Sequence, residues 1–283
     1  MSSTLTIDTC LNTDSLKWMD EYQGQPFADL VFADPPFNIG WKYNTYDDEQ
    51  PEDDFIDWNR RWINLAISKV LKPFGQIYIC MGDEYVADIC QICKRELKLT
   101  MQNWLVWHYT FGQSGKLDHR KRFTRSKTHI LRFSVHPRKF YFDPISVAVP
   151  SGRLLEYADK RADPRGKCPD DVFITKRIAG THKDRFPGMS TQMSEDLVKP
   201  WIIATTKAGD TIYDPFPGSG VSMVVAKKTG RHFFATELDT DYHSRILNRL
   251  NVLPHSNIQS PCPPTQPLHS EQSSSDQNQC PQS

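Results

Sequence analysis

The segment Asp29-Leu30-Val31-Phe32-Ala33 limits the fold of this chain more than any other, because it is continuously apolar after its first residue. A strand with one face in water alternates apolar and polar side chains, whereas a strand buried on both faces is apolar throughout. A helical spacing of apolar residues follows over 55–71, and 76–80 is a second apolar strand. Strand, helix and strand in this order predict an α/β fold, with a mixed, mostly parallel sheet and helices on both faces.

The same alternation extends through most of the chain. We predict further strands at 5–7, 104–107, 130–133, 211–213 and 232–236, and helices at 84–97, 195–206, 222–229 and 242–250. The alternation weakens between about residues 111 and 185, and we interpret 113–185 as an insertion within one domain spanning 1–253. Residues 254–283 are rich in Pro, Ser and Gln and nearly free of large apolar residues, so we expect a disordered tail there.

Composition argues against several classes of protein. A hydrophobic fraction of 38% fits a packed core, and no stretch approaches the roughly 20 apolar residues needed to cross a bilayer. The seven cysteines form no zinc-type or disulfide framework, and Cys90 and Cys93 fit the buried side of a helix better than a metal or redox site. The first residues lack a basic segment followed by an apolar run, so no signal peptide is expected. These features predict a cytoplasmic protein without a bound metal.

Formal net charge is zero, so only a local cluster of charge can indicate a polyanionic partner. One such cluster lies in the insertion and interleaves aromatic residues with Lys116, Arg120, Lys121, Arg122, Arg125 and Lys127. It fits contact with the phosphate backbone of a nucleic acid. A solvated basic loop explains the same residues equally well.

The motif Asp34-Pro35-Pro36-Phe37 follows the first apolar strand directly. In open α/β sheets, ligands bind beyond the carboxyl ends of the strands, where this motif would lie. Two prolines fix the backbone at the Pro35 carbonyl. This carbonyl and the Asp34 carboxylate can each accept one hydrogen bond from the exocyclic amine of adenine or cytosine. The nitrogen lone pair can then attack a sulfonium methyl group, and Phe37 offers a face on which the base can stack. For the tetrapeptide alone, a simple turn remains the alternative.

A glycine-containing turn, Asp214-Pro215-Phe216-Pro217-Gly218-Ser219-Gly220, lies between a predicted strand and a predicted helix. Its glycines allow a ligand to approach the backbone closely. Glu237 ends the next strand, where an acid can bind the two ribose hydroxyls of a nucleoside. A nicotinamide dinucleotide would use similar geometry, but the third glycine of its fingerprint is missing because position 223 is Met. The turn therefore favours a nucleoside cofactor without phosphates, of which S-adenosyl-L-methionine is one.

Together, the segments DLVFADPPFNIG, LKPFGQIYIC and DPFPGSG resemble the motifs of the beta class of amino-group DNA methyltransferases, over about residues 6–250. The resemblance implies the class I S-adenosylmethionine-dependent methyltransferase fold, with a seven-stranded sheet and a circularly permuted motif order. The catalytic residues that it implies are Asp34, Pro35, Pro36 and Phe37. The cofactor-binding residues that it implies are Asp8, Gln192, Asp214, Phe216, Gly218, Gly220 and Glu237.

The chain departs from the family pattern at three places. Pro217 stands where a small residue is usual, Val221 and Ser222 replace two threonines, and Met193-Ser194 replaces Lys-Pro. These departures concern the cofactor-binding segments. Weaker cofactor binding, or a catalytically silent DNA-binding protein, is therefore an alternative.

The family implies methyl transfer to a base flipped out of double-stranded DNA, with residues 113–185 as the target-recognition region. Asp34 favours N6 of adenine, and N4 of cytosine is the closest alternative. An RNA or protein methyltransferase and a nicotinamide-dependent oxidoreductase are more distant ones. The resemblance leaves open a homodimer and a cognate restriction endonuclease as partners, and it implies a cytoplasmic, nucleoid-associated enzyme without membrane contact.

Overall fold

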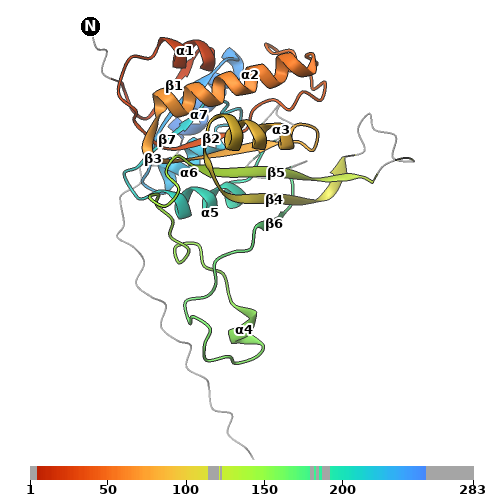
Figure 1. The fold of residues 1–283 in the computed structure, drawn as a ribbon, viewed down its shortest axis with the longest axis vertical. Coiled ribbons are helices and arrows are strands. Elements are labelled where there is room, and N and C mark those ends of the chain that lie inside the picture. The colour runs from red at the N-terminus through yellow and green to blue at the C-terminus, as the bar shows by residue number, and fades with distance from the viewer. Residues whose placement is uncertain are drawn as a thin grey trace, which may run out of the picture.

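The computed structural model describes residues 5–113, 121, 123–178, 182, 185–186 and 192–252. Within them, one eight-stranded sheet has the order β1-β8-β7-β2-β3-β5-β4-β6 (Figure 1). The strands are β1 (Thr9–Asn12), β2 (Ala28–Ala33), β3 (Leu71–Met81), β4 (Thr100–Gln113), β5 (Arg125–Ser134), β6 (Val172–Thr175), β7 (Thr211–Asp214) and β8 (His232–Glu237). The helices are α1 (Ser15–Glu21), α2 (Glu52–Leu65), α3 (Val86–Gln91), α4 (Gly152–Leu155), α5 (Glu195–Thr205), α6 (Val221–Lys228) and α7 (Thr240–Asn251), with π-helical turns at Ala66–Val70 after α2 and Ile92–Glu96 after α3.

The sheet is mixed and mostly parallel, which confirms the sequence-based prediction. Pairing is parallel from β1 across to β3, β5 runs antiparallel to β3 and β4, and β6 runs parallel to β4. The described sheet has eight strands where seven were expected, because β6, from the predicted insertion, adds to the edge beside β4.

Strand β2 is buried on both faces, as its apolar sequence requires. Leu30 and Phe32 pack with α5, α6 and α7 on one face, while Val31 and Ala33 pack with α1, α2 and α3 on the other. None of these four side chains is more than 1% exposed. Helices on both faces of the sheet are therefore confirmed as well.

The connections leave β2 and β7 in opposite directions along the sheet. The chain passes from β2 through α2 to β3 on one side, and from β7 through α6 to β8 on the other. The two strands are direct neighbours, with Leu30 opposite Ile212. Such a reversal opens a crevice at the carboxyl ends of the strands, where open α/β sheets bind ligands. Asp34 follows β2 and Asp214 ends β7, so both predicted motifs begin at this crevice.

The first strand lies later in the sequence than predicted. The expected strand at 5–7 is wrong, because β1 spans Thr9–Asn12 and Asp8, with φ of 60°, turns the chain before it. The Asp8 carboxylate contacts the His232 Nδ1 atom at 2.8 Å and accepts the Phe233 backbone N–H at 3.1 Å. Asp8 therefore lies beside the first residues of β8, far along that strand from Glu237. Asp14 is the acid that follows the carboxyl end of β1.

The interval 113–185 does not form one separate unit in the described part of the chain. Strand β5 falls inside it, yet β5 pairs with β3 and β4 within the central sheet. The segment 149–167, which contains α4, projects from the body as an arm, and β6 then returns to the sheet edge (Figure 1). Residues 114–120, 122 and 253–283, which include the expected tail, lie outside the described residues. No helix in the described ranges has the length and apolar character needed to span a bilayer.

Candidate active site

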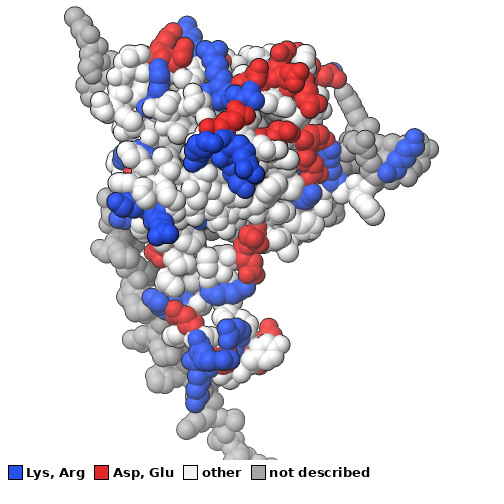
Figure 2. Space-filling view, in the orientation of Figure 1, with Lys and Arg blue, Asp and Glu red and all other residues white. Residues whose placement is uncertain are grey.

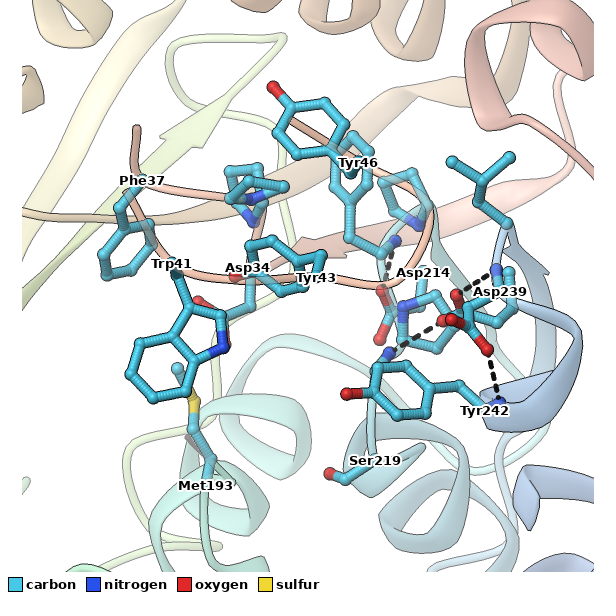
Figure 3. Close-up of a pocket in the computed structure, with 18 of the residues that line it drawn as sticks. Asp34, Phe37, Trp41, Tyr43, Tyr46, Met193, Asp214, Ser219, Asp239 and Tyr242 are labelled. Atoms are coloured by element: carbon cyan, nitrogen blue, oxygen red, sulfur yellow. Dashed lines mark hydrogen bonds between the residues drawn. The ribbon is translucent and has the colours of Figure 1, made fainter. Parts of the chain in front are cut away.

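A cavity of about 270 Å³ opens where β2 and β7 end (Figure 3). The two motifs singled out in the sequence meet in its wall, although 180 positions separate Asp34 from Asp214. From the two motifs, the wall contains Asp34, Pro35, Pro36, Phe37, Asp214, Phe216 and Gly218. The sheet topology therefore brings all four predicted catalytic residues and the glycine-containing turn to one site.

Asp34 presents its carboxylate to this cavity. Burial, together with the negative charge of Asp214, raises the pKa of Asp34 to about 7. No hydrogen bond or cation among the described residues acts to lower that pKa. A carboxylate in this condition is an acceptor available to the N–H group of a ligand, and it favours a ligand that brings positive charge.

Asp214 holds the turn that follows β7. It is 3% exposed, and its carboxylate accepts the Phe216 backbone N–H at 3.0 Å and the Ser222 hydroxyl. Burial raises its pKa to about 7 in spite of these bonds. Ser222 is one of the departures from the family pattern, and here it braces the turn. The Phe216 ring packs against Trp58 and Trp62 of α2, at centroid distances of 5.4 and 5.2 Å.

The two glycines of the turn serve different purposes. Both have left-handed backbone conformations, with φ of 50° at Gly218 and 73° at Gly220, which favour glycine. Gly218 lines the cavity, as predicted for close approach of a ligand. Gly220 lies outside the cavity wall and begins α6, and a Cβ atom there would meet Ile246 at 3.3 Å. Gly220 therefore shapes the turn and its packing on α7.

Glu237 ends β8 inside the cavity and is 8% exposed. Its carboxylate accepts the Gly218 backbone N–H at 3.2 Å and the Asp239 backbone N–H at 2.9 Å. Burial is the main reason that its pKa rises to about 7. Asp14 lines the same cavity and caps α1 by accepting the Lys17 backbone N–H at 2.7 Å.

Acidic side chains therefore gather where the strands end: Asp14, Asp34, Asp214, Glu237 and Asp239 all line the cavity. Within the described part of the chain, no group of His, Cys, Asp and Glu is arranged to hold a metal ion. Such a wall suits a ligand with positive charge and hydroxyl groups, and it opposes one that carries phosphates.

Two residues of the predicted cofactor set lie away from the cavity. Asp8 is at the opposite end of β8 from Glu237, held by His232 and Phe233 as described above. Gln192 is buried, and its Oε1 atom accepts the Phe186 backbone N–H at 2.8 Å. Its neighbour Met193 lines the cavity instead. The structure thus replaces Asp8 by Asp14 and Gln192 by Met193 as cavity residues.

The predicted DNA-contacting cluster is only partly described. Arg125 and Lys127 line the cavity, but both form ion pairs: Lys127 with Asp83 at 2.8 Å, and Arg125 with Glu84 and, at 3.7 Å, Asp83. Lys121 is exposed. The remaining members of the cluster, Lys116, Arg120 and Arg122, lie outside the described residues.

The arm carries charge of both signs. Figure 2 shows basic and acidic side chains close together on it, and Arg153 and Arg161 both pair with Asp159. Arg165 pairs with Asp163 at 2.8 Å. These pairs balance part of the positive charge of the arm.

Sequence reasoning missed several residues of the cavity wall. Tyr109 of β4 and Arg177, which follows β6, lie together, with the guanidinium 5.0 Å from the ring centre. Trp41 and Tyr43, on the loop after Phe37, also line the cavity. The alternation of Trp107 and Tyr109 along a strand was a usable signal. For the other three, the sequence offered no periodicity.

Comparison with known proteins agrees with this geometry. A sequence model of the family described as DNA methylase (N6_N4_Mtase) matches residues 28–248. The chain is 32% identical to the type II methyltransferase M.HpaI of Haemophilus parainfluenzae over 223 residues, which cover 79% of this chain and 68% of the relative. It is 30% identical to the DNA adenine methyltransferase YhdJ of Escherichia coli (strain K12), covering 87% of this chain and 84% of the relative.

Solved structures share the fold. A crystal structure of an M1.HpyAVI–SAM complex superposes with a TM-score of 0.61 at 21% identity, covering 86% of this chain and 99% of that one. The PvuII DNA methyltransferase, described as cytosine-N4-specific, superposes with a TM-score of 0.65 at 16% identity, covering 91% of this chain and 89% of that one.

Proposed function

This chain belongs to the N6/N4 family of site-specific DNA methyltransferases, and within that family we propose that its target is the exocyclic N6 of adenine. The observation that carries the proposal is the Asp34 carboxylate, which faces the cavity with its pKa raised to about 7. Within the family, a leading Asp in this motif is commoner among adenine enzymes than among cytosine enzymes. The likeness to YhdJ, which is named a DNA adenine methyltransferase, supports the same choice.

The cofactor is S-adenosyl-L-methionine, and the acidic cavity wall fits it. The molecule carries positive charge on its sulfur and its amino group, negative charge on one carboxylate, two ribose hydroxyls, and no phosphate, so its net charge is positive. We assign Glu237 to the ribose hydroxyls and the turn at Asp214, Phe216 and Gly218 to the rest of the cofactor. We assign Asp14, at the carboxyl end of β1, to the cofactor-binding role that the resemblance implied for Asp8. Gly220 supports the turn indirectly.

Asp34 and Pro35 prepare the target amine for reaction. S-adenosyl-L-methionine supplies an electrophilic methyl group on its sulfur. The Asp34 carboxylate and the Pro35 carbonyl each accept one hydrogen bond from an N–H group of the amine. These two hydrogen bonds draw the nitrogen lone pair out of conjugation with the ring. Fixed acceptors of this kind favour the charge that develops in the transition state. The methylated nitrogen is cationic and acidic, so its proton leaves without a strong base.

The target base reaches this pocket by leaving the DNA helix. Phe37 offers one stacking face beside Asp34, and Trp41 lies close by in the same wall (Figure 3). Arg177, Arg125 and Lys127 are basic groups at the cavity, and we assign them to the DNA backbone around the flipped nucleotide. To bind phosphate, Arg125 and Lys127 must give up their ion pairs with Asp83 and Glu84.

Two partners and one location belong to the same proposal. Because relatives are named type II methyltransferases, we propose a cognate restriction endonuclease of matching sequence specificity. A homodimer is proposed by analogy with the family, and sedimentation with and without DNA would test it. We propose that the enzyme acts at the nucleoid, within the cytoplasm.

The proposal is tested with purified protein, unmethylated genomic DNA and S-adenosyl-L-methionine. After digestion, mass spectrometry of the nucleosides identifies the product. We expect N6-methyladenine, which is absent when Asp34→Asn protein is used. N4-methylcytosine would keep the mechanism and overturn the choice of base, whereas methylation of RNA alone would overturn the DNA substrate.

A further inference from the structure

The loop at 38–50, directly after the catalytic motif, is held by several internal hydrogen bonds. Asp48 is 2% exposed, and its carboxylate accepts the backbone N–H groups of Asn38 at 2.8 Å, Ile39 at 3.1 Å and Trp41 at 2.8 Å. Asn38 and Gln50 exchange two further bonds, of 2.8 and 2.9 Å, between the Asn38 side chain and the Gln50 backbone. The loop therefore has a defined shape of its own, which presents Trp41 to the cavity.

The same loop crosses to the cofactor side of the site. The Asn44 amide Nδ2 donates to the Asp239 carboxylate Oδ2 at 2.9 Å. In Figure 3, Tyr43 lies beside Asp34, and Asp239 and Tyr242 lie on the opposite side of the cavity. The Asn44–Asp239 bond therefore joins the segment after β2 to the segment after β8 within the cavity wall.

Asp239 is well placed to relay this contact. Its other oxygen caps α7 by accepting the Asp241 and Tyr242 backbone N–H groups at 2.8 and 3.0 Å. Its own backbone N–H donates to Glu237 at 2.9 Å. A continuous series of hydrogen bonds thus runs from the catalytic loop to the acid assigned to the cofactor ribose.

We propose that Asn44 is a positioning residue that couples the two halves of the site. By binding Asp239, Asn44 fixes the loop over the cofactor, so that a bound cofactor prepares the pocket for the target base. The inference rests on the proposed function. It predicts that cofactor and loop stabilise each other, since coupling between two sites is reciprocal and typically amounts to roughly 5–150-fold in affinity.

If the Asn44–Asp239 bond is only a surface contact, a different result is expected. Asn44 is exposed, and a hydrogen bond at the surface can contribute little. In that case its removal changes neither cofactor affinity nor the loop. Asn64, an exposed asparagine on α2 away from the cavity, provides the matched control variant.

The first test needs no DNA and no turnover. Calorimetry measures the affinity of each variant for S-adenosylhomocysteine, and hydrogen exchange measures protection of peptides from 38–50. We expect cofactor to protect the loop in wild type and Asn64→Ala. In Asn44→Ala we expect that protection to be lost and the affinity to fall roughly tenfold, within the usual range of such coupling.

A reciprocal exchange provides the sharper test. In Asn44→Asp, two carboxylates oppose each other, whereas in Asp239→Asn the Asn44 amide can turn over and accept from the new amide. The double variant restores one donor and one acceptor, and the asparagine side chain introduced by Asp239→Asn keeps an oxygen that can cap α7. We expect Asn44→Asp to lose loop protection and the double variant to regain it.

The outcomes separate this inference from the function on which it rests. Wild-type affinity and protection in Asn44→Ala would overturn the coupling and leave the methyltransferase assignment intact. A double variant no better than the worse single variant would do the same. A wild-type chain that does not bind S-adenosylhomocysteine would overturn the proposed function and this inference with it.

Discussion

Asp34 and Asp214 stand at the carboxyl ends of the adjacent parallel strands β2 and β7, where burial and the charge of Asp214 raise the pKa of Asp34 to about 7. The pKa of Asp214 is raised to about 7 as well, chiefly by its own burial. Placing two buried acids together is unfavourable in the free protein. The arrangement is understandable if the site receives a positively charged cofactor and an N–H donor.

The pH dependence of cofactor binding follows from these acids. Asp34, Asp214 and Glu237 have pKa values raised to about 7, so a share of them is protonated at pH 6. A cationic ligand favours the ionised forms, and its affinity therefore rises from pH 6 to pH 8. Calorimetry should show a steeper rise for S-adenosyl-L-methionine than for S-adenosylhomocysteine, which lacks the sulfonium charge. Equal slopes for the two ligands would contradict the account.

Stability should respond to Asp34 in the opposite sense. Its pKa is about 7 in the folded chain against an ordinary 3.8, so the folded state holds the proton more tightly. Ionisation therefore lowers the stability of the free protein as pH rises from about 4 to above 7. Asn at this position removes that cost, which is on the order of 2–4 kcal/mol at pH 8.

Thermal unfolding of the cofactor-free protein measures this effect. At pH 8, Asp34→Asn should melt several degrees above wild type. Near pH 4, the two proteins should melt at the same temperature. Glu21→Gln, an exposed acid at the end of α1, should show no such difference. A lower melting temperature for Asp34→Asn at pH 8 would show that an unrecognised cation balances Asp34.

Glu237 should act on cofactor binding more than on the chemical step. Substitution by Gln keeps the shape but replaces one acceptor of a backbone N–H by a donor, so Gly218 or Asp239 loses its partner. We expect the KM for S-adenosyl-L-methionine to rise at least tenfold, with kcat at saturation changed much less. A fall in kcat alone would place Glu237 in the chemical step.

Asp14 and Asp8 provide a direct test of the proposed cofactor contacts. Asp14→Asn retains an oxygen that can cap α1 but removes a charge from the cavity wall, so cofactor affinity should fall about tenfold, as for loss of a charged hydrogen bond. Asp8→Asn lies at the other end of β8 and should leave affinity unchanged. Calorimetry on both variants decides the matter, and the reverse result would restore the original assignment.

Much of the site could be predicted because its chemistry is local to strand ends. A continuous apolar strand followed by Asp34 and Phe37, and a strand followed by Gly218, place these residues at the carboxyl edge without knowledge of the fold. Asp8 lies outside the cavity wall because the first strand begins later in the sequence than predicted. The better signal was Asp14, a helix-capping residue directly before the amphipathic helix α1.

The remaining part of the site depends on contacts between distant segments. Asp239 and Asn44 meet although 195 positions separate them, and nothing in either segment indicates the other. Arg177 reaches the cavity only because β6 joins the edge of the sheet beside β4. Burial raises the pKa of Asp34 only once the strands are assembled. Such features follow from tertiary packing, which periodicity does not report.

The most direct test of the central claim is methylation-sensitive sequencing of DNA from cells that express the wild-type chain or Asp34→Ala. Loss of the Asp34 acceptor should reduce transfer by roughly 10²–10³-fold, the usual effect of removing one transition-state contact. We predict N6-methyladenine within one short sequence motif in the wild type and none in the variant, which should still bind S-adenosylhomocysteine. Equal methylation in the two strains would contradict the account.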